Sequence, residues 1–141
     1  MPSIRTVCLL NTVYNMGDSI ERCVGALQHQ DYSNYEIILV DDGSKDDSLS
    51  KCKCLAQKDK RIQVIHTENR GSGPARNEGI RAANGRYAYF PDADDYLEPC
   101  GLTKMVEAMD DGKKIFLLMI LKADAMTSET VWDFWRQLEQ L

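Results

Sequence analysis

The chain has 141 residues, a formal net charge of −5 and 43% hydrophobic residues, which fits one globular domain with its own core. The mildly acidic charge and the lack of a long basic stretch argue against nucleic acid as a partner. The longest apolar run, Ile115 to Leu121, is far shorter than a membrane-spanning helix, and the N-terminus lacks a signal-peptide core. The five cysteines include no C-x-x-C pair, and Cys52 and Cys54 lack a second pair for zinc, so we expect reduced thiols in a cytoplasmic protein.

Segments of strand and helix character alternate along the first hundred residues. Short apolar runs predict strands at residues 6–12, 35–40, 61–66 and 86–90. Helical spacing of apolar residues predicts helices at 18–30, 46–58, 75–83 and 99–109, with 68–74 as a loop. This alternation predicts an α/β fold, a three-layer α/β/α sandwich with a mainly parallel sheet and right-handed crossovers.

Polar residues follow every one of the four expected strands. In a parallel sheet, ligands bind beyond the carboxyl ends of the strands. The sequence therefore predicts one shared site at that edge. Its polar segments are residues 12–15, 41–44, 69–77 and 92–95.

The acidic segment after the fourth expected strand suggests a metal site. Asp92, Asp94 and Asp95 lie within four positions, where three carboxylates repel each other unless a cation or hydrogen-bond donors offset the repulsion. Mg²⁺ and Mn²⁺ prefer oxygen ligands and often share them with a phosphate. The alternative is a solvated acidic turn, because such short acidic motifs are common.

Three further residues suggest a nucleotide. Asp41 can accept a hydrogen bond from an imide or a ribose hydroxyl, and Tyr14 can either stack on a base or be a half-buried loop tyrosine. Arg76, expected in the first turn of its helix, can face a phosphate or form a surface ion pair. A nicotinamide cofactor is disfavoured because no G-x-G-x-x-G follows the first strand, and the phosphate-loop pattern is also absent. A metal-bound nucleoside diphosphate fits these residues, and displacement of that diphosphate from a sugar would use them.

A series of motifs extends this reading. They are Val13-Tyr14-Asn15, Tyr35 to Ser48, Glu68-Asn69-Arg70-Gly71, Ala75 to Ile80, Ala83 to Tyr87, and Phe90 to Leu97. The series resembles the family 2 glycosyltransferases of the GT-A fold over about residues 4–109. The resemblance implies that Thr12, Tyr14 and Asp41 hold a uracil and its ribose. This sequence departs from the usual pattern of the family at Thr12, where proline is common.

The resemblance also implies the remaining site residues. The residues expected to bind the nucleotide sugar are Thr12, Tyr14, Asn15, Asp41, Asp42, Arg76, Asp92 and Ala93. The expected metal ligands are Asp94 and Asp92, with Asp95 as a further candidate, and the ion is Mn²⁺ or Mg²⁺.

The function implied is metal-dependent, inverting transfer of a sugar from a UDP-sugar to a hydroxyl of a saccharide or lipid-linked acceptor. Residues 1–112 would form the nucleotide-sugar-binding core and 113–141 a short extension, with the acceptor-binding half missing. No catalytic base is assigned, because the acids after residue 113 lie in no recognisable motif. The alternatives are a truncated or degenerate nucleotide-binding domain without turnover, and a nucleotidyltransferase.

The C-terminal segment gives a weaker signal. An apolar run predicts a strand over residues 113–122, and helical spacing predicts an amphipathic helix over 127–141. Its two tryptophans, Trp132 and Trp135, would pack on the domain or on a partner, and a homodimer through them is one hypothesis. Peripheral association with the inner face of the membrane is another.

Overall fold

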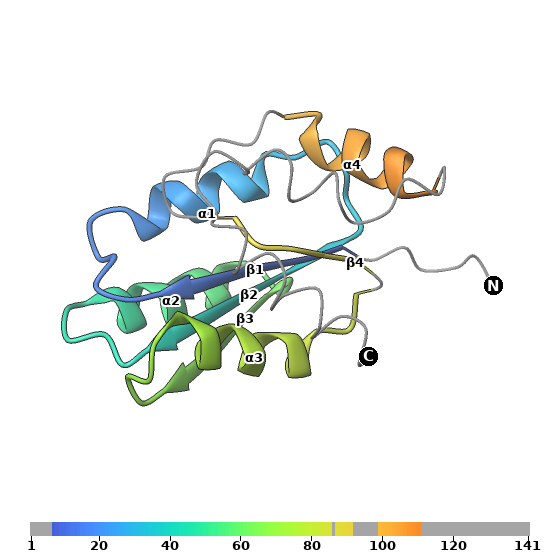
Figure 1. Ribbon diagram of the computed structural model, residues 1–141. Coiled ribbons are helices and arrows are strands. Elements are labelled where there is room, and N and C mark those ends of the chain that lie inside the picture. The colour runs from blue at the N-terminus through green and yellow to red at the C-terminus, as the bar shows by residue number, and fades with distance from the viewer. Residues whose placement is uncertain (1–6, 86, 92–98, 111–141) are drawn as a thin grey trace. The chain divides into compact units, whose positions relative to one another are not determined.

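The computed structural model of the chain describes residues 7–85, 87–91 and 99–110 (Figure 1). The strands are β1 (Val7–Val13), β2 (Tyr35–Asp42), β3 (Ile62–Thr67) and β4 (Tyr87–Tyr89). The helices are α1 (Ile20–Gln28), α2 (Ser48–Lys58), α3 (Ser72–Ala82) and α4 (Gly101–Asp110). The predicted alternation of strands and helices is confirmed.

The four strands form one sheet in the order β3-β2-β1-β4, and every neighbouring pair is parallel. Val7 lies opposite Tyr35 on one side and Tyr87 on the other, while Ile37 lies opposite Ile62. All four strands therefore start at one end of the sheet, the amino edge, and end at the other, the carboxyl edge. This confirms the predicted parallel sheet.

One face of the sheet packs against α3. Cys8, Leu10, Ile38 and Val40 are buried there together with Ala75 of the helix. The contact is close, because a Cβ built on Gly79 of α3 would come within 2.3 Å of Leu10 Cδ1. These four strand residues occupy alternate positions of β1 and β2, so their side chains lie on one face of the sheet. Their burial agrees with the apolar runs from which the sequence predicted buried strands.

The opposite face of the sheet is covered by α1 and α2, as Figure 1 shows. Leu9, Ile37 and Leu39 are fully buried on this face, as are Ile20 and Val24 of α1. A buried polar contact crosses the same layer, where Asn11 Nδ2 donates to Cys23 Sγ of α1 at 3.2 Å. Helices on both faces complete the three-layer sandwich.

Two predicted boundaries were wrong in ways that affect the site. Strand β2 continues through Asp42, whereas the sequence placed its end at Val40. Since side chains alternate along a strand, Asp41 and Asp42 point to opposite faces of the sheet. Helix α3 begins at Ser72, not Ala75. Pro74 is compatible with the first helical turn because its missing N–H has no partner there in any case.

The segment after β4 is tied back to the chain that follows α1. Leu102 N donates to Gln30 Oε1 at 3.2 Å, and Thr103 Oγ1 donates to Asp31 Oδ1 at 2.7 Å. Helix α4 starts at Gly101, two residues after its predicted start. The predicted strand at 113–122, the helix at 127–141 and the boundary at residue 112 lie outside the described residues. No helix in the described part of the chain has the length and apolar character to cross a bilayer.

Candidate functional site at the carboxyl edge

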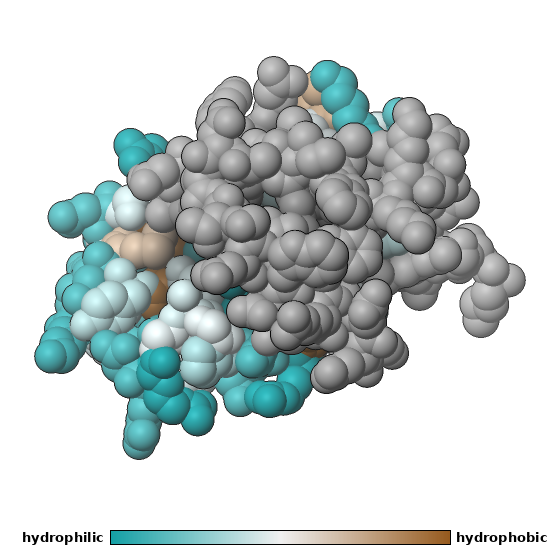
Figure 2. Space-filling view, in the orientation of Figure 1, coloured by the Kyte–Doolittle hydropathy of each residue, from teal (hydrophilic) through white to brown (hydrophobic). Residues whose placement is uncertain are grey.

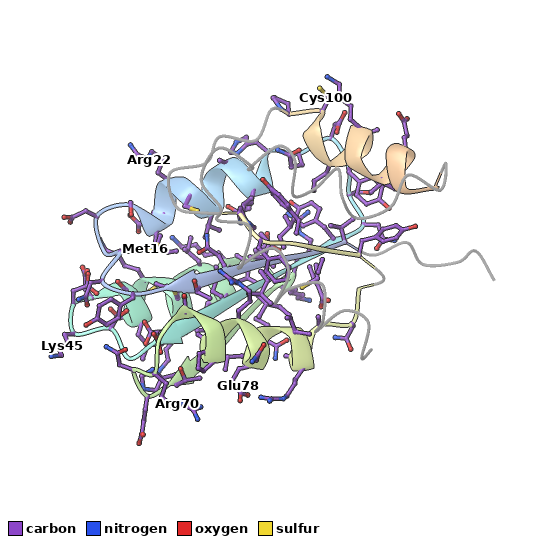
Figure 3. All side chains as sticks on the ribbon, viewed as in Figure 1. Met16, Arg22, Lys45, Arg70, Glu78 and Cys100 are labelled. Atoms are coloured by element: carbon purple, nitrogen blue, oxygen red, sulfur yellow. The ribbon has the colours of Figure 1, made fainter. Side chains whose placement is uncertain are left out.

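Three loops gather at the carboxyl edge, where Met16, Lys45 and Arg70 mark them in Figure 3. In Figure 2, the surface at the left, where these loops lie, is largely hydrophilic. The first two loops are joined by hydrogen bonds between residues far apart in sequence. Asn15 N donates to Ser44 Oγ at 3.0 Å, and Lys45 N donates to Asn15 Oδ1 at 2.9 Å. Asn15 has φ 49°, a left-handed conformation that asparagine tolerates better than most residues.

A second pair of contacts strengthens this junction. Met16 N donates to Ser48 Oγ at 2.7 Å, and Gly17 N donates to Asp46 Oδ2 at 2.9 Å. The Ser48 hydroxyl also donates to Asp46. The Ser48 hydroxyl, followed by Gly17 N–H, holds the pKa of Asp46 below its usual value. Sequence reasoning assigned no site role to Asp46 or Ser48, because both fall in an ordinary helix start.

Tyr14 sits at the beginning of the joined loops and is the exposed large apolar side chain of the described residues, with 43% of its surface accessible. The neighbouring residue, Asn15, forms hydrogen bonds to the second loop through both its backbone N–H and its side chain. An exposed aromatic ring on a fixed loop can stack on a planar base. Stacking by Tyr14 on a base therefore stays a prediction. Asn15 already uses its backbone N–H and its side-chain oxygen in hydrogen bonds to the second loop, and these contacts compete with its predicted contact to a ligand.

Asp42 holds the third loop. Its Oδ1 accepts a hydrogen bond from Arg70 N at 2.9 Å, and its Oδ2 accepts one from Gly71 N at 3.1 Å. Gly43 follows with φ 67°, and a Cβ there would come within 2.7 Å of Asn69 N. Both carboxylate oxygens of Asp42 thus have backbone partners, which gives Asp42 a role in anchoring the start of α3.

Asp41 differs from Asp42 because one of its oxygens has no partner within the described part of the chain. Its side chain is fully buried, on the face covered by α1 and α2. Oδ2 accepts a hydrogen bond from Ser44 N at 3.3 Å, and His66 Nδ1 lies 2.8 Å from the same oxygen. Oδ1 is the buried side-chain polar atom of the described residues without a hydrogen-bond partner. A buried carboxylate oxygen without a donor is costly, so this position suits a donor brought by a ligand.

Cys52 of α2 lies on the same side of the sheet. Burial, followed by the charges of Asp41 and Asp46, raises the pKa of its thiol to about 11. The thiol therefore stays protonated near neutral pH and is a poor nucleophile there. We assign it to the packing beneath Asp41.

Two other predicted residues lie on the α3 side. Thr12 is half-buried. Its position in the strand puts it on the same face of the sheet as Asp42 and on the opposite face from Asp41. Arg76 is in the second turn of α3, so the prediction that it lies in the first turn was wrong. Its guanidinium carbon lies 5.6 Å from the centre of the Phe90 ring, within cation–π range. The amides of the first turn, which favour anions, therefore precede Arg76.

The predicted metal ligands Asp92 and Asp94, along with Ala93, lie outside the described residues. Within the ranges that the structure describes, no group of three or more His, Cys, Asp or Glu side chains is placed to hold a metal ion. The assignment of Mn²⁺ or Mg²⁺ to these acids stays a prediction.

A family profile described as "Glycosyl transferase family 2" matches residues 9–140 of this sequence. The chain belongs to this family. The match includes β1 from Leu9 onward, the other three strands and the loops of the carboxyl edge. The predicted family and its GT-A fold are confirmed.

Known proteins of this kind extend well beyond the present chain. EpsH of Bacillus subtilis (strain 168) is 43% identical over 105 residues, which are 74% of this chain and 30% of EpsH. S. aureus TarS 1–349, solved in complex with UDP-GlcNAc, has 26% identity and a TM-score of 0.69 over 75% of this chain and 31% of its own. The mannosyltransferase PcManGT from Pyrobaculum calidifontis, in complex with GDP-Man and Mn²⁺, has 26% identity and a TM-score of 0.64 over 73% and 31% of the two chains. The chain thus spans about a third of the length of each of these three proteins.

Besides Asp46 and Ser48, sequence reasoning missed His66 at this edge. It was assigned to the third strand, and the polar segment after that strand was taken to start at Asn69. The parallel register places His66 beside Asp41, which is why the two side chains meet. A sequence signal existed, since His66 is the last residue of the strand predicted at 61–66 and a strand-end position belongs to the edge where ligands bind.

Proposed function

We propose that this chain binds the nucleoside diphosphate of a UDP-sugar at its carboxyl edge and provides the donor-binding part of a glycosyl transfer. The observation that carries the proposal is Asp41 Oδ1, a buried acceptor without a partner among the described residues. It lies at the edge where parallel sheets bind ligands. Structural relatives in complex with UDP-GlcNAc or with GDP-Man and Mn²⁺ support the same ligand class.

The chemistry of Asp41 restricts the base. An ionised carboxylate only accepts hydrogen bonds, so the facing ring nitrogen of the base must carry a hydrogen. Uracil meets this requirement through N3–H, and guanine through N1–H. Cytosine N3 and adenine N1 are acceptors and would face the carboxylate lone pairs, which disfavours both bases. The family resemblance favours uridine, and exposed Tyr14 would stack on the ring.

Binding requires a local opening of this edge, because the Asp41 side chain is fully buried. His66 lies over it with 55% of its side chain exposed. A shift of the side chains around Oδ1, with the contact between His66 and Oδ2 kept, would admit the edge of a base without disturbing the sheet. The hydrogen bonds that join the loops at Asn15 and Ser44 would keep Tyr14 in place during that shift.

The transfer itself would break the bond between the anomeric carbon of the sugar and a diphosphate oxygen. The diphosphate leaves with the electron pair, and an acceptor hydroxyl forms the new bond and loses its proton. With inversion, the hydroxyl attacks from the opposite side of the anomeric carbon. The described residues would bind and orient the nucleotide, and we assign no residue of this chain as the base.

Isothermal titration of the 141-residue chain with UDP, GDP, CDP and ADP in the presence of Mn²⁺ tests the proposal. We expect the tightest binding for UDP and a loss of about tenfold to a hundredfold in Asp41→Asn, since the variant presents an amide in place of a pure acceptor. Asp59→Asn, at the amino edge, is the matched control and should bind UDP as the wild type does. Equal affinities for UDP and CDP, or an unchanged affinity in Asp41→Asn, would contradict the proposal.

Metal dependence is tested separately. UDP binding with and without Mn²⁺ should differ in the wild type and not in Asp94→Ala, if Asp94 ligates the ion that bridges the diphosphate. Binding of uridine, which lacks phosphates, should not respond to Mn²⁺ in either protein. A metal effect on uridine would place the ion elsewhere.

A further inference from the structure

His66 and Asp41 form a pair at the end of the central strands. His66 Nδ1 lies 2.8 Å from Asp41 Oδ2, and the parallel register places the two residues side by side on β3 and β2. The Asp41 side chain is fully buried, whereas 55% of the His66 side chain is exposed. The imidazole therefore contacts the carboxylate from the solvent side.

The hydrogen bond has a defined direction. An ionised carboxylate has no hydrogen to donate, so the hydrogen of this contact must be on His66 Nδ1. Ser44 N donates to the same oxygen, Oδ2, at 3.3 Å. Two donors on Oδ2 fix the rotation of the carboxylate and leave Oδ1 as the oxygen without a partner among the described residues.

We propose that His66 is a positioning residue for nucleotide recognition, which holds the Asp41 carboxylate so that Oδ1 faces the ring N–H of the base. This inference depends on the proposed function of the site. Without His66, one donor remains on Oδ2, the carboxylate rotates more freely, and the preference for bases with a ring N–H falls. His66 acts through Asp41 and does not itself contact the nucleotide.

Two closely related substitutions distinguish positioning from general packing. The amide nitrogen of asparagine can occupy the place of imidazole Nδ1, whereas the amide of glutamine lies one methylene further from the backbone. His66→Asn should therefore keep the hydrogen bond to Asp41, and His66→Gln and His66→Leu should lose it. His29, the other histidine of the chain, is exposed at the end of α1, near the amino edge, and His29→Leu is the control.

The experiment measures UDP and CDP affinities of the 141-residue chain by isothermal titration with Mn²⁺ present. We expect His66→Leu and His66→Gln to weaken UDP binding about tenfold and to reduce the UDP-to-CDP ratio, corresponding to loss of one charge-assisted hydrogen bond. His66→Asn should stay within about threefold of the wild type, and His29→Leu should be unchanged. Equal UDP affinity in His66→Asn and His66→Gln would overturn the inference.

A second measurement does not depend on ligand affinity. Nitrogen-15 NMR of the two histidine rings in the free protein should show His66 with its hydrogen on Nδ1, and Asp41→Ala should remove that preference. An Nε2–H form of His66, or no change in Asp41→Ala, would also overturn the inference. If Asp41→Asn impairs UDP binding while all His66 variants bind normally, the inference fails and the proposed function stands. If the wild-type chain does not bind UDP, both fail together.

Discussion

The two edges of the sheet use carboxylates differently. At the amino edge, Glu36 Oε1 accepts hydrogen bonds from Asn84 N at 2.6 Å and Gly85 N at 2.8 Å. Asp59 is paired there with Arg61 at 2.9 Å and also accepts from Gln28 Nε2. At the carboxyl edge, Asp42 is satisfied in the same way, but Asp41 keeps one buried oxygen without a partner among the described residues.

This difference separates stability from binding. Carboxylates whose oxygens all have donors within the chain contribute to folding and have little left to offer a ligand. A buried acceptor without a donor costs stability, and such costs are characteristic of sites that bind something. We therefore expect variants of the amino edge to change stability alone and variants of the carboxyl edge to change UDP binding as well.

The largest loss of stability is expected for Asp42→Ala. The substitution leaves two backbone N–H groups, those of Arg70 and Gly71, without their acceptors, at a position that is only 5% exposed. We expect a loss of about 2 to 3 kcal/mol in the free energy of unfolding, measured by urea denaturation. UDP binding should weaken too, because the third loop of the site loses its anchor.

Asp42→Asn is the matched control for this prediction. It retains one acceptor oxygen and should lose about half as much stability, with a smaller effect on UDP binding. If Asp42→Ala unfolds like the wild type, the third loop does not depend on Asp42. If it is destabilised yet binds UDP normally, the loop does not belong to the site.

The sequence predicted the sheet and the family well because both depend on local patterns. Apolar runs such as that of β2 fix a buried strand, and Asp41 was identified from its position after that run. The sequence could not show that Asp41 and Asp42 point to opposite faces, since this depends on where hydrogen bonding between strands ends. Nor could it show the contact between His66 and Asp41, which arises from the register of two strands that are separated by a helix.

Glu36→Ala should have an intermediate effect confined to stability. Glu36 is half-buried, and its partners lie in the segment between α3 and β4, so their N–H groups regain part of their hydrogen bonding from water. We expect a loss of about 1 to 2 kcal/mol in the free energy of unfolding. UDP affinity, measured at a temperature where the variant is folded, should be unchanged. A weaker affinity would mean that the amino edge is coupled to the site, which would break the comparison.

The smallest effect is expected for Asp59→Asn, and it depends on pH. Hydrogen bonds from the Arg61 side chain hold the pKa of Asp59 well below its usual value, with further bonds from Arg61 N–H and Gln28. Because the folded pKa is lowered, the stabilising contribution is fully present above the unfolded pKa of about 3.9 and is lost as the pH falls through the folded value. Since Arg61 is partly exposed, we expect a difference from the wild type of under about 1 kcal/mol at pH 7, shrinking below pH 4. Urea unfolding of both proteins from pH 7 to pH 3 measures it. A difference that stays constant over this range would show that Asp59 contributes through packing and not through its charge, while UDP affinity should remain at the wild-type value throughout.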